Sequence, residues 1–280
     1  MLSESSVLES KRVAVVVPAY CEARLIGRTL SGLPEFVDAI YVVDDASTDD
    51  TALAAAASKD PRLRVLQHAR NQGVGAAIVT GYRAALLDGA DVVAVMAGDA
   101  QMDPADLHAV VAPVLADSAD YVKGNRFRST LRRQMPWQRR LAGKVLSSAT
   151  RWASGLQVDD CQCGYTAIGR RALCALPLGE LWPRFGYPND LLLMLARHGL
   201  RVAEVTVRPI YADERSGVRA WHAFVIAGLL VRRCFSARSR HQRAGRPIQL
   251  LRDLRAGVEP AAHRVVLDDY GAAAPHAGAE

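Results

Sequence analysis

The sequence contains no uninterrupted apolar run of the roughly 20 residues that a helix needs to span a bilayer. The longest candidate, residues 220–231, is interrupted by His222 and followed by Arg232 and Arg233. The polar start of the chain also lacks the basic and apolar regions of a secretory signal peptide. We therefore expect a cytoplasmic protein without a transmembrane helix, which would meet a membrane only as a peripheral protein on its inner face.

Cysteine is scarce, and several common functional motifs are missing. The five cysteines are an odd number in a long chain, which argues against a disulfide scaffold and favours a reducing compartment. Cys161-Gln162-Cys163 does not have zinc-site spacing, and no second cysteine pair completes four ligands, so we expect a structural role for both thiols. The chain also has no P-loop, no G-x-G-x-x-G fingerprint and no G-x-S-x-G nucleophile motif.

The composition is that of a protein with a packed core. Apolar residues make up 50% of the 280 residues and charged residues 23%, which excludes disordered, collagen-like and coiled-coil chains. The length predicts either one large domain or one domain with appendages.

The positive charge is concentrated in two windows. Residues 123–144 contain eight basic residues and no acidic one, and residues 219–255 contain nine arginines and one acidic residue. Because each window carries +8 within a total of +6, the rest of the chain carries −10. This layout argues against nucleic-acid binding, and it favours local sites for a phosphate group and for an anionic surface.

Continuous apolar segments alternate with segments of helical periodicity. The predicted strands are 12–18, 39–44, 63–67, 91–96, 120–123 and 202–207, with a strand or turn region at 158–169. The predicted helices are 22–33, 49–58, 75–87, 104–115, 137–153, 188–198 and 221–235. This alternation predicts an α/β fold with a mostly parallel central sheet and helices on both faces.

Carboxylates follow two of the predicted strands, where such sheets bind ligands. Asp44-Asp45 ends the second strand, and two adjacent carboxylates need hydrogen-bond donors or a cation, which a nucleobase and ribose or a metal would supply. Asp99 and Gln101 follow the fourth strand, and their oxygens suit Mg²⁺ with a diphosphate completing its shell.

Simpler structural roles exist for several neighbouring residues. Asp44 is equally explained as a strand end and Asp49 as a helix cap, and we expect Asp103 to cap the helix that begins at Pro104. The Gly-rich turn 71–75 could direct backbone N–H groups at a phosphate, although its spacing is neither that of a P-loop nor that of G-x-G-x-x-G.

Taken together, the segments resemble family 2 glycosyltransferases of the GT-A fold, and within them the dolichyl- or polyprenyl-phosphate sugar transferases. The resemblance rests on P-A-Y-x-E at 18–22, V-V-D-D-A-S-T-D-x-T at 42–51, N-x-G at 71–73, G-D-A-Q-M-D-P at 98–104, K-G-N-R-F at 123–127, D-C-Q-C-G-Y at 160–165, Y-P-N-D at 187–190 and E-R-S-G at 214–217. It covers about residues 13–219.

The resemblance implies a set of site residues. Those expected to bind the nucleotide sugar are Pro18, Tyr20, Glu22, Val43, Asp45, Ala97, Gly98, Asp99, Arg126, Arg215 and Arg219. Asp99 and Gln101 would hold Mg²⁺ or Mn²⁺, and Asp190 and Asp99 would be catalytic, with Asp190 on the acceptor side. The implied reaction is an inverting transfer of a sugar from a UDP-glucose or GDP-mannose type of donor to a polyprenyl or dolichyl phosphate.

The sequence departs from the family pattern at Ala97, where the commoner loop reads Asp-x-Asp. We expect weaker or differently arranged metal binding rather than loss of activity. Two alternatives stay open: a family 2 enzyme acting on a saccharide, glycolipid or small-molecule hydroxyl, and a catalytically silent module that binds nucleotide sugars. A nucleotidyltransferase is disfavoured because no Gly-rich, Lys-bearing loop follows the first strand.

The predicted organisation has three parts. Residues 1–218 form the catalytic domain, 219–256 a basic amphipathic helical segment suited to an anionic membrane surface, and 257–280 a disordered tail. The basic stretch 123–144 is a second candidate, in this case for the acceptor phosphate. The sequence identifies neither the sugar nor the base.

Overall fold

The computed structural model describes residues 11–131, 135, 137–210, 228 and 264–265. The elements are β1 (Val13–Ala19), α2 (Ile26–Ser31), β2 (Ala39–Asp44), α3 (Thr51–Ala56), β3 (Leu63–Gln67), α4 (Val74–Leu87), β4 (Val92–Val95), η1 (Pro104–Asp106), α5 (Leu107–Leu115), β5 (Tyr121–Asn125), α6 (Trp137–Ser154), β6 (Thr166–Gly169), α7 (Arg170–Ala175), η3 (Leu178–Glu180), α8 (Tyr187–Arg197), β7 (Val202–Thr206) and β8 (Arg264–Val265). No helix in this part of the chain is both long and apolar enough to cross a bilayer.

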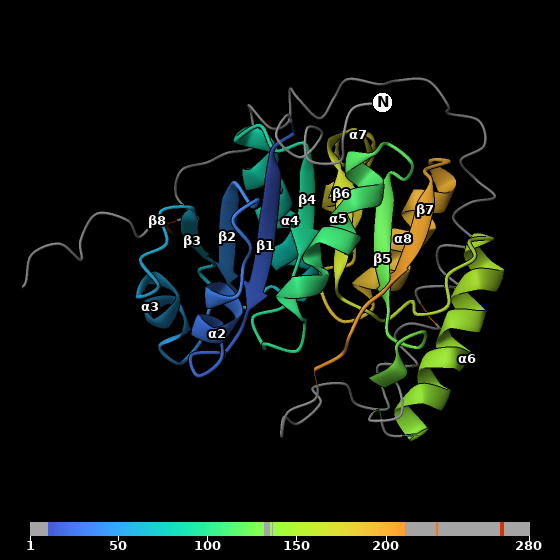
Figure 1. Cartoon of the computed structure of the whole chain (residues 1–280), viewed down its shortest axis with the longest axis horizontal. Coiled ribbons are helices and arrows are strands. Elements are labelled where there is room, and N and C mark those ends of the chain that lie inside the picture. Colours follow the sequence, from blue (N-terminus) through green and yellow to red (C-terminus); the bar gives the residue numbers. More distant parts are fainter. Residues whose placement is uncertain (1–10, 132–134, 136, 211–227, 229–263, 266–280) are drawn as a thin grey trace, which may run out of the picture.

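The strands form one mixed sheet, shown in Figure 1, with the order β7-β5-β6-β4-β1-β2-β3-β8. Strands β1 to β4 are parallel to one another, and β5 is parallel to β7. Strand β6 runs antiparallel to both of its neighbours, β4 and β5. The predicted α/β fold with a mostly parallel sheet is therefore confirmed.

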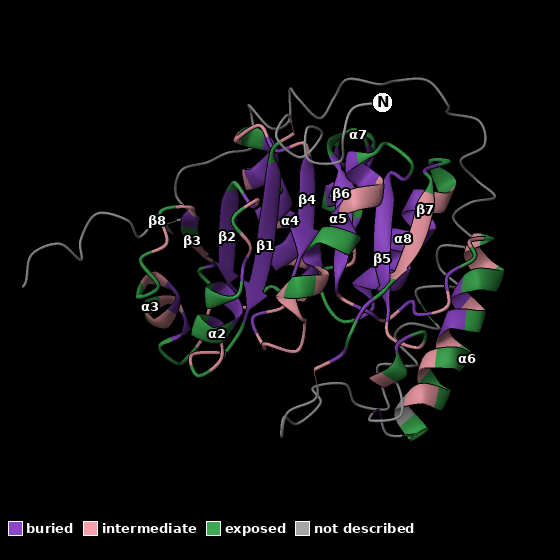
Figure 2. Cartoon of the chain, viewed as in Figure 1, coloured by how far each residue is buried: buried purple, intermediate pink, exposed green. Residues whose placement is uncertain are grey.

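Helices cover both faces of the sheet. Alternate residues of β1 point to opposite faces: Val13 and Val15 pack with α2 and α5, whereas Ala14 and Val16 pack with α4 and α8. Every residue of β1, β2 and β4 is buried, as a parallel sheet covered on both faces requires (Figure 2). Helix α6 stands beyond β7 and packs through Leu146 and Ala149 on Leu193 of α8.

Pro18 is unusual for a central strand, because proline cannot donate a ladder hydrogen bond. The C=O groups of Val16 and Pro18 accept hydrogen bonds from Met96 and Gly98, so this edge of β1 faces β4. The β4 ladder has already ended at Val95, opposite Val16. The missing N–H of Pro18 therefore lies where β1 and β4 separate. The chain that follows β4 leaves the sheet at this point as a loop.

Most predicted elements are present, including the strand that contains Lys123. Lys123 lies within β5 and is fully buried, so the basic stretch 123–144 begins in a strand and ends in α6. The expected helix at 221–235 and the segment 219–256 lie outside the described residues, except for Gly228, which is helical. Within the tail that we expected to be disordered, Arg264–Val265 forms β8, antiparallel to β3.

Candidate functional site

The loops that follow β1 and β2 are held together by hydrogen bonds. The N–H of Cys21 donates to Ser47 Oγ at 2.9 Å, and the N–H of Glu22 donates to Thr51 Oγ1 at 2.8 Å. Asp49 Oδ2 accepts the N–H of Ala23 at 3.2 Å. Because both loops leave the carboxyl ends of neighbouring parallel strands, the P-A-Y-x-E and D-D-A-S-T-D segments form one continuous structure.

Asp45 is the most firmly held carboxylate of this region. Its Oδ1 accepts the N–H of Gln72 at 2.8 Å, its Oδ2 accepts the N–H of Gly73 at 2.7 Å, and His68 Nδ1 lies 2.7 Å from Oδ1. Burial raises the pKa of Asp45, but the hydrogen bonds from His68, Gln72 and Gly73 outweigh burial and lower the pKa below its usual value. The turn 71–75, weighed above as a phosphate loop, thus directs two of its amides at a carboxylate of the protein.

The neighbouring Asp44 acts mainly within its own loop. Asp44 Oδ1 accepts the N–H of Ser47 at 3.1 Å and also the Ser47 hydroxyl, while Oδ2 accepts Gln67 Nε2 at 3.2 Å. The strand-end role weighed for Asp44 is therefore confirmed. Asp49 accepts the N–H of Thr51 at 3.1 Å, but the N-cap residue of α3 is Asp50, one residue after the cap predicted at Asp49.

The loop after β4 lies against the end of β1. The N–H of Gly98 donates to the Pro18 C=O at 3.2 Å, and a Cβ on Gly98 would meet the Ile26 side chain at 3.0 Å and Ala19 at 3.3 Å. Asp99 Oδ1 accepts the N–H of Gln101 at 3.1 Å, which turns the loop back on itself. Asp103 Oδ1 accepts the N–H of Ala105 at 3.0 Å, which confirms its predicted capping role.

Asp190 lies in the first turn of α8 and is almost completely buried. Its Oδ2 accepts the N–H of Trp182 at 2.9 Å. The adjacent Asn189 donates from Nδ2 to Thr150 Oγ1 of α6 at 2.6 Å and accepts Gln162 Nε2 at 2.6 Å. These contacts tie the start of α8 to α6 and to the segment that contains the two neighbouring cysteines.

Asp45 and Asp190 are connected through the start of α4. The C=O of Pro183 accepts the N–H of Ala76 at 3.1 Å, and a Cβ on Gly75 would lie 2.3 Å from the Trp182 C=O. A Cβ on Gly73 would lie 2.5 Å from the Pro183 C=O. Only glycine permits this close approach, so the two glycines bring the loop at 182–183, and with it Asp190, against the turn that binds Asp45.

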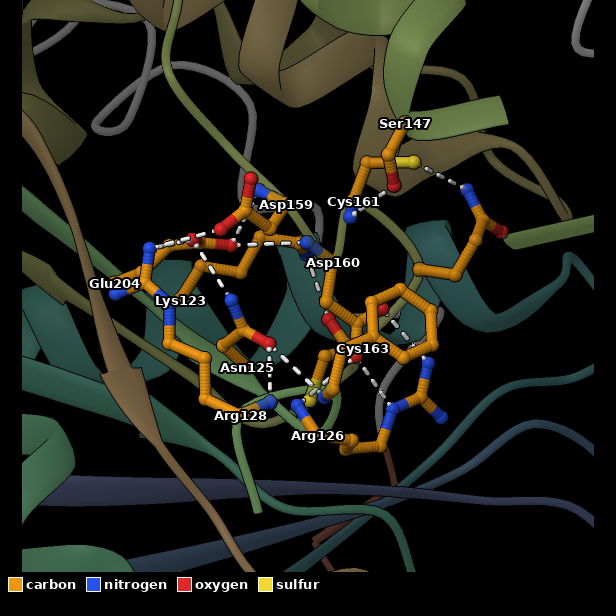
Figure 3. Close-up of polar contacts among 12 residues, drawn as sticks. Lys123, Asn125, Arg126, Arg128, Ser147, Asp159, Asp160, Cys161, Cys163 and Glu204 are labelled. Atoms are coloured by element: carbon orange, nitrogen blue, oxygen red, sulfur yellow. Dashed lines mark hydrogen bonds and ion pairs between the residues drawn. The ribbon is translucent and has the colours of Figure 1, made fainter. Parts of the chain in front are cut away.

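Arg126 is part of a buried polar network at the ends of β5 and β7, shown in Figure 3. Its Nε and Nη2 donate to the two oxygens of Asp160 at 2.8 and 2.9 Å, and its N–H donates to Asp160 Oδ2 at 3.1 Å. Burial raises the pKa of Asp160, but the charge and hydrogen bonds of Arg126 outweigh burial and lower the pKa. The guanidinium is therefore fixed by the protein, and its contact with a phosphate stays a prediction.

The same network contains two residues that sequence reasoning missed. Glu204 of β7 accepts the N–H groups of Asp159 and Asp160 through Oε1, at 2.9 and 3.0 Å, and accepts Asn125 Nδ2 through Oε2 at 2.9 Å. Lys123 donates from Nζ to the Cys163 C=O at 2.6 Å. The only sequence signal for Glu204 is a charge within an otherwise apolar strand.

Cys161 and Cys163 have the structural role predicted for them. Both thiols are buried, and Cys161 Sγ accepts hydrogen bonds from Gln162 and Asn189. Burial raises the pKa of the Cys163 thiol. The described residues contain no cluster of three or more His, Cys, Asp or Glu side chains suited to a metal.

Of the remaining predicted residues, five lie in the described part of the chain and two lie outside it. Pro18 and Val43 are buried at the strand ends, Tyr20 is exposed in the loop after β1, and Ala97 and Gly98 lie in the loop after β4. Arg215 and Arg219 lie outside the described residues. The structure therefore brings together the loops after β1, β2 and β4 with the start of α8 at the carboxyl edge of the sheet, next to the point between β1 and β4 where the strand order reverses.

The chain is similar in sequence to known sugar transferases. The chain is 32% identical to an undecaprenyl-phosphate mannosyltransferase of Micrococcus luteus over 70% of this chain and 82% of that protein. It is 27% identical to a UDP-N-acetylglucosamine–dolichyl-phosphate N-acetylglucosaminyltransferase of Methanococcus voltae, over 74% of this chain and 88% of that protein.

The fold is also similar to that of a solved structure. Glucosyl-3-phosphoglycerate synthase of Mycobacterium tuberculosis, in complex with Mn²⁺, UDP and glucosyl-3-phosphoglycerate, superimposes with a TM-score of 0.65 at 23% identity, over 83% of each chain. The model of the family described as glycosyl transferase family 2 matches residues 14–175. The chain has the GT-A fold and belongs to glycosyltransferase family 2.

Proposed function

We propose that this family 2 glycosyltransferase moves a sugar from a nucleoside-diphosphate sugar to a polyprenyl or dolichyl phosphate, with inversion at the anomeric carbon. The observation that carries the proposal is the junction of the β1, β2 and β4 loops with Asp190 at one edge of the sheet. Relatives that cover most of the chain and are named for lipid-phosphate acceptors support this choice of acceptor.

The donor would lie along the carboxyl ends of β1, β2 and β4. In this proposal the loop of Pro18, Tyr20 and Glu22, together with Val43 and Asp45, contacts the base and ribose. The firm internal bonding of Asp45 implies that it shapes this loop and offers its remaining acceptor capacity to the nucleotide. The exposed ring of Tyr20 is available for stacking on the base.

The oxygen donors of the loop after β4 suit a hard cation. The Asp99 carboxylate and the Gln101 amide are the types of ligand that Mg²⁺ and Mn²⁺ accept, and one carboxylate with a substrate diphosphate is a common set for Mg²⁺. A divalent ion bound there supplies positive charge that offsets the charge of the leaving diphosphate. Because Ala97 contributes no carboxylate, the diphosphate itself would supply a larger share of the ligands of the cation.

Asp190 is proposed to orient the acceptor. A lipid phosphate is already anionic at neutral pH, so it attacks without needing strong deprotonation, and the carboxylate then acts by positioning. With a hydroxyl acceptor, the same group would have to remove a proton as a general base. Arg126, Arg215 and Arg219 are proposed to contact phosphates of the donor or acceptor.

The test is a transfer assay with the full chain. UDP-glucose and GDP-mannose are each incubated with Mg²⁺ or Mn²⁺ and a detergent-dispersed polyprenyl phosphate, and the lipid is analysed by mass spectrometry. We expect a hexose on the lipid phosphate, lost when EDTA is added, and no product with the corresponding polyprenol. Transfer only to saccharides or small hydroxyl compounds would overturn the proposed acceptor, and nucleotide-sugar binding without any transfer would identify a silent binding module.

A further inference from the structure

Helix α6 exposes a row of apolar side chains. Trp137, Leu141, Val145 and Trp152 are 62, 56, 63 and 86% exposed, respectively. Their spacings of four, four and seven residues place them on one face of the helix. Two tryptophans, a leucine and a valine aligned in this way form an apolar stripe that nothing in the described part of the chain covers. Figure 2 shows exposed segments along the length of α6.

Basic residues run beside this stripe. Arg140, Lys144 and Arg151 each directly precede one of the apolar residues, so they form a parallel row. Arg151 forms an ion pair with Asp159 at 3.2 Å, whereas neither Arg140 nor Lys144 makes an ion pair within the described residues. The helix contains no acidic residue at all.

The opposite face of α6 is anchored to the site. Leu146, Ala149 and Ala153 pack against Leu193 of α8, and Thr150 Oγ1 accepts the hydrogen bond from Asn189, the residue before Asp190. In Figure 1 one end of α6 extends past the carboxyl edge of the sheet, where the site loops lie. The outer face of α6 is thus rigidly connected to the start of α8.

We propose that this outer face docks the protein on an anionic phospholipid surface. An apolar stripe with tryptophans, flanked by cations, matches the chemistry of the membrane interface, where indole rings lie at headgroup level and basic residues face anionic lipid. A second copy of the chain fits less well, because a twofold contact between two α6 helices would bring like charges together. The segment 221–235 carries only basic charge as well, from Arg232 and Arg233.

This inference deepens the proposed function, on which its functional meaning rests. A polyprenyl phosphate keeps its chain in the bilayer and its phosphate at the surface. Docking through α6 would hold the Asp190 end of the site at that surface, so the acceptor would not have to leave the membrane.

The experiment measures flotation of the full chain with vesicles that contain no polyprenyl phosphate and no donor. One set is phosphatidylcholine alone, and the other contains about 30 mol % phosphatidylglycerol, enough to give a strongly negative surface. We expect flotation only with the anionic vesicles. Leu141→Gln/Trp152→Gln and Arg140→Gln/Lys144→Gln should each lower the partition coefficient roughly ten-fold or more.

Matched controls remove exposed residues elsewhere. Leu53→Gln/Leu87→Gln changes two apolar residues that are 49 and 59% exposed, and Lys59→Gln/Arg83→Gln removes two exposed cations. Both should float like the parent, and circular dichroism should show all four variants folded. Equal flotation of the α6 variants and the parent, or no flotation of the parent, overturns the docking surface. Light scattering that shows a parent dimer dissociated by the α6 variants also overturns it, in favour of a second copy.

The result is separable from the proposed function. A chain that fails to float but transfers a sugar to detergent-dispersed polyprenyl phosphate loses only the docking surface. A chain that floats through α6 but transfers no sugar keeps the docking surface and loses the lipid-phosphate acceptor.

Discussion

At the scale of single residues, the acidic groups of the site fall into two kinds. Asp45 and Asp160 are held by several short hydrogen bonds from the protein itself, so their first role is to fix loops. Asp99 lies in a tight loop and Asp190 at the start of a helix, each beside a segment from another strand or helix. These are the two positions proposed above for the cation and for the acceptor.

Asp99→Ala and Asp190→Asn should each lower turnover at least about 100-fold, the scale of losing one key transition-state contact. The reason is that Asp99 supplies the only carboxylate proposed for the cation, and Asp190 the only one proposed for the acceptor. Steady-state kinetics with saturating donor would measure the effect. Turnover of both variants within a few-fold of the parent would refute the site assignment.

Arg126→Ala should lower the free energy of unfolding by roughly 3–5 kcal/mol, because it leaves the buried Asp160 without its cation. Arg151→Ala is the matched control, since Arg151 and its partner Asp159 are both well exposed and such a pair contributes only about 0–1 kcal/mol. Urea unfolding of both variants tests this. Equal losses would mean that the Arg126–Asp160 pair is not the stabilising contact.

At the scale of elements, the start of α4 links the two halves of the site. Gly73 and Gly75 allow the loop at 182–183 to approach, and this loop donates to Asp190. A larger residue would separate α4 from that loop rather than simply fill space.

Gly75→Ala should destabilise the protein by about 1–3 kcal/mol, the usual cost of overpacking, because its Cβ would lie 2.3 Å from the Trp182 C=O. Gly27→Ala in α2 is the control: a Cβ there meets nothing within 4 Å, and alanine favours a helix. Thermal and urea unfolding would compare them. If the Gly75 variant were as stable as the Gly27 variant, the loop at 182–183 would move away from the new Cβ without lowering the free energy of unfolding.

The elements also show what sequence can and cannot predict. The bounds of β2 and β3 match the prediction. Strand β2 is buried throughout and is a continuous apolar run that ends at Asp44, whereas β3 is only partly buried and contains the exposed Arg64. Helix α7 was not predicted, since six residues give too little periodicity. The burial of Lys123 was not predicted, because charge in a sequence does not reveal burial and its partner, the Cys163 C=O, comes from a distant segment.

The same limit applies to the site. The motifs predicted the residues of the loops after β1, β2 and β4, because each motif is a continuous segment that follows one predicted strand. The partners of the site carboxylates have no motif of their own and follow from topology. Examples are His68, which contacts Asp45 in the loop after β2, and Glu204, which contacts Asp159 and Asp160 in the segment before β6.

At the scale of the whole molecule, several buried carboxylates have a lowered pKa. Arg201 lowers the pKa of Asp120 against the effect of burial, and the groups described above do so for Asp45 and Asp160. These groups are spread over both ends of the sheet, so they stabilise the fold and not only the site.

The free energy of unfolding should therefore fall as the pH drops below about 4, the usual aspartate pKa. A folded-state pKa below the unfolded value contributes stability at higher pH, and that contribution is lost as the pH falls through the folded pKa. Urea unfolding between neutral and strongly acidic pH would measure it, and Asp120→Asn should flatten part of the slope. Stability that is constant or rises on acidification would contradict the assignment.

Cys21 is exposed in the loop after β1, where its backbone has a φ of 57°. Chemical labelling of its thiol can therefore report binding at the proposed donor site. A maleimide should alkylate it readily, and a nucleotide sugar bound against the same loop should shield it from the reagent. Cys174, exposed on α7 at the opposite edge of the sheet, provides an internal reference whose labelling the ligand should leave unchanged. Peptide mapping of the two adducts would thus report donor occupancy without any turnover, and equal protection of both thiols would mean that the ligand binds elsewhere.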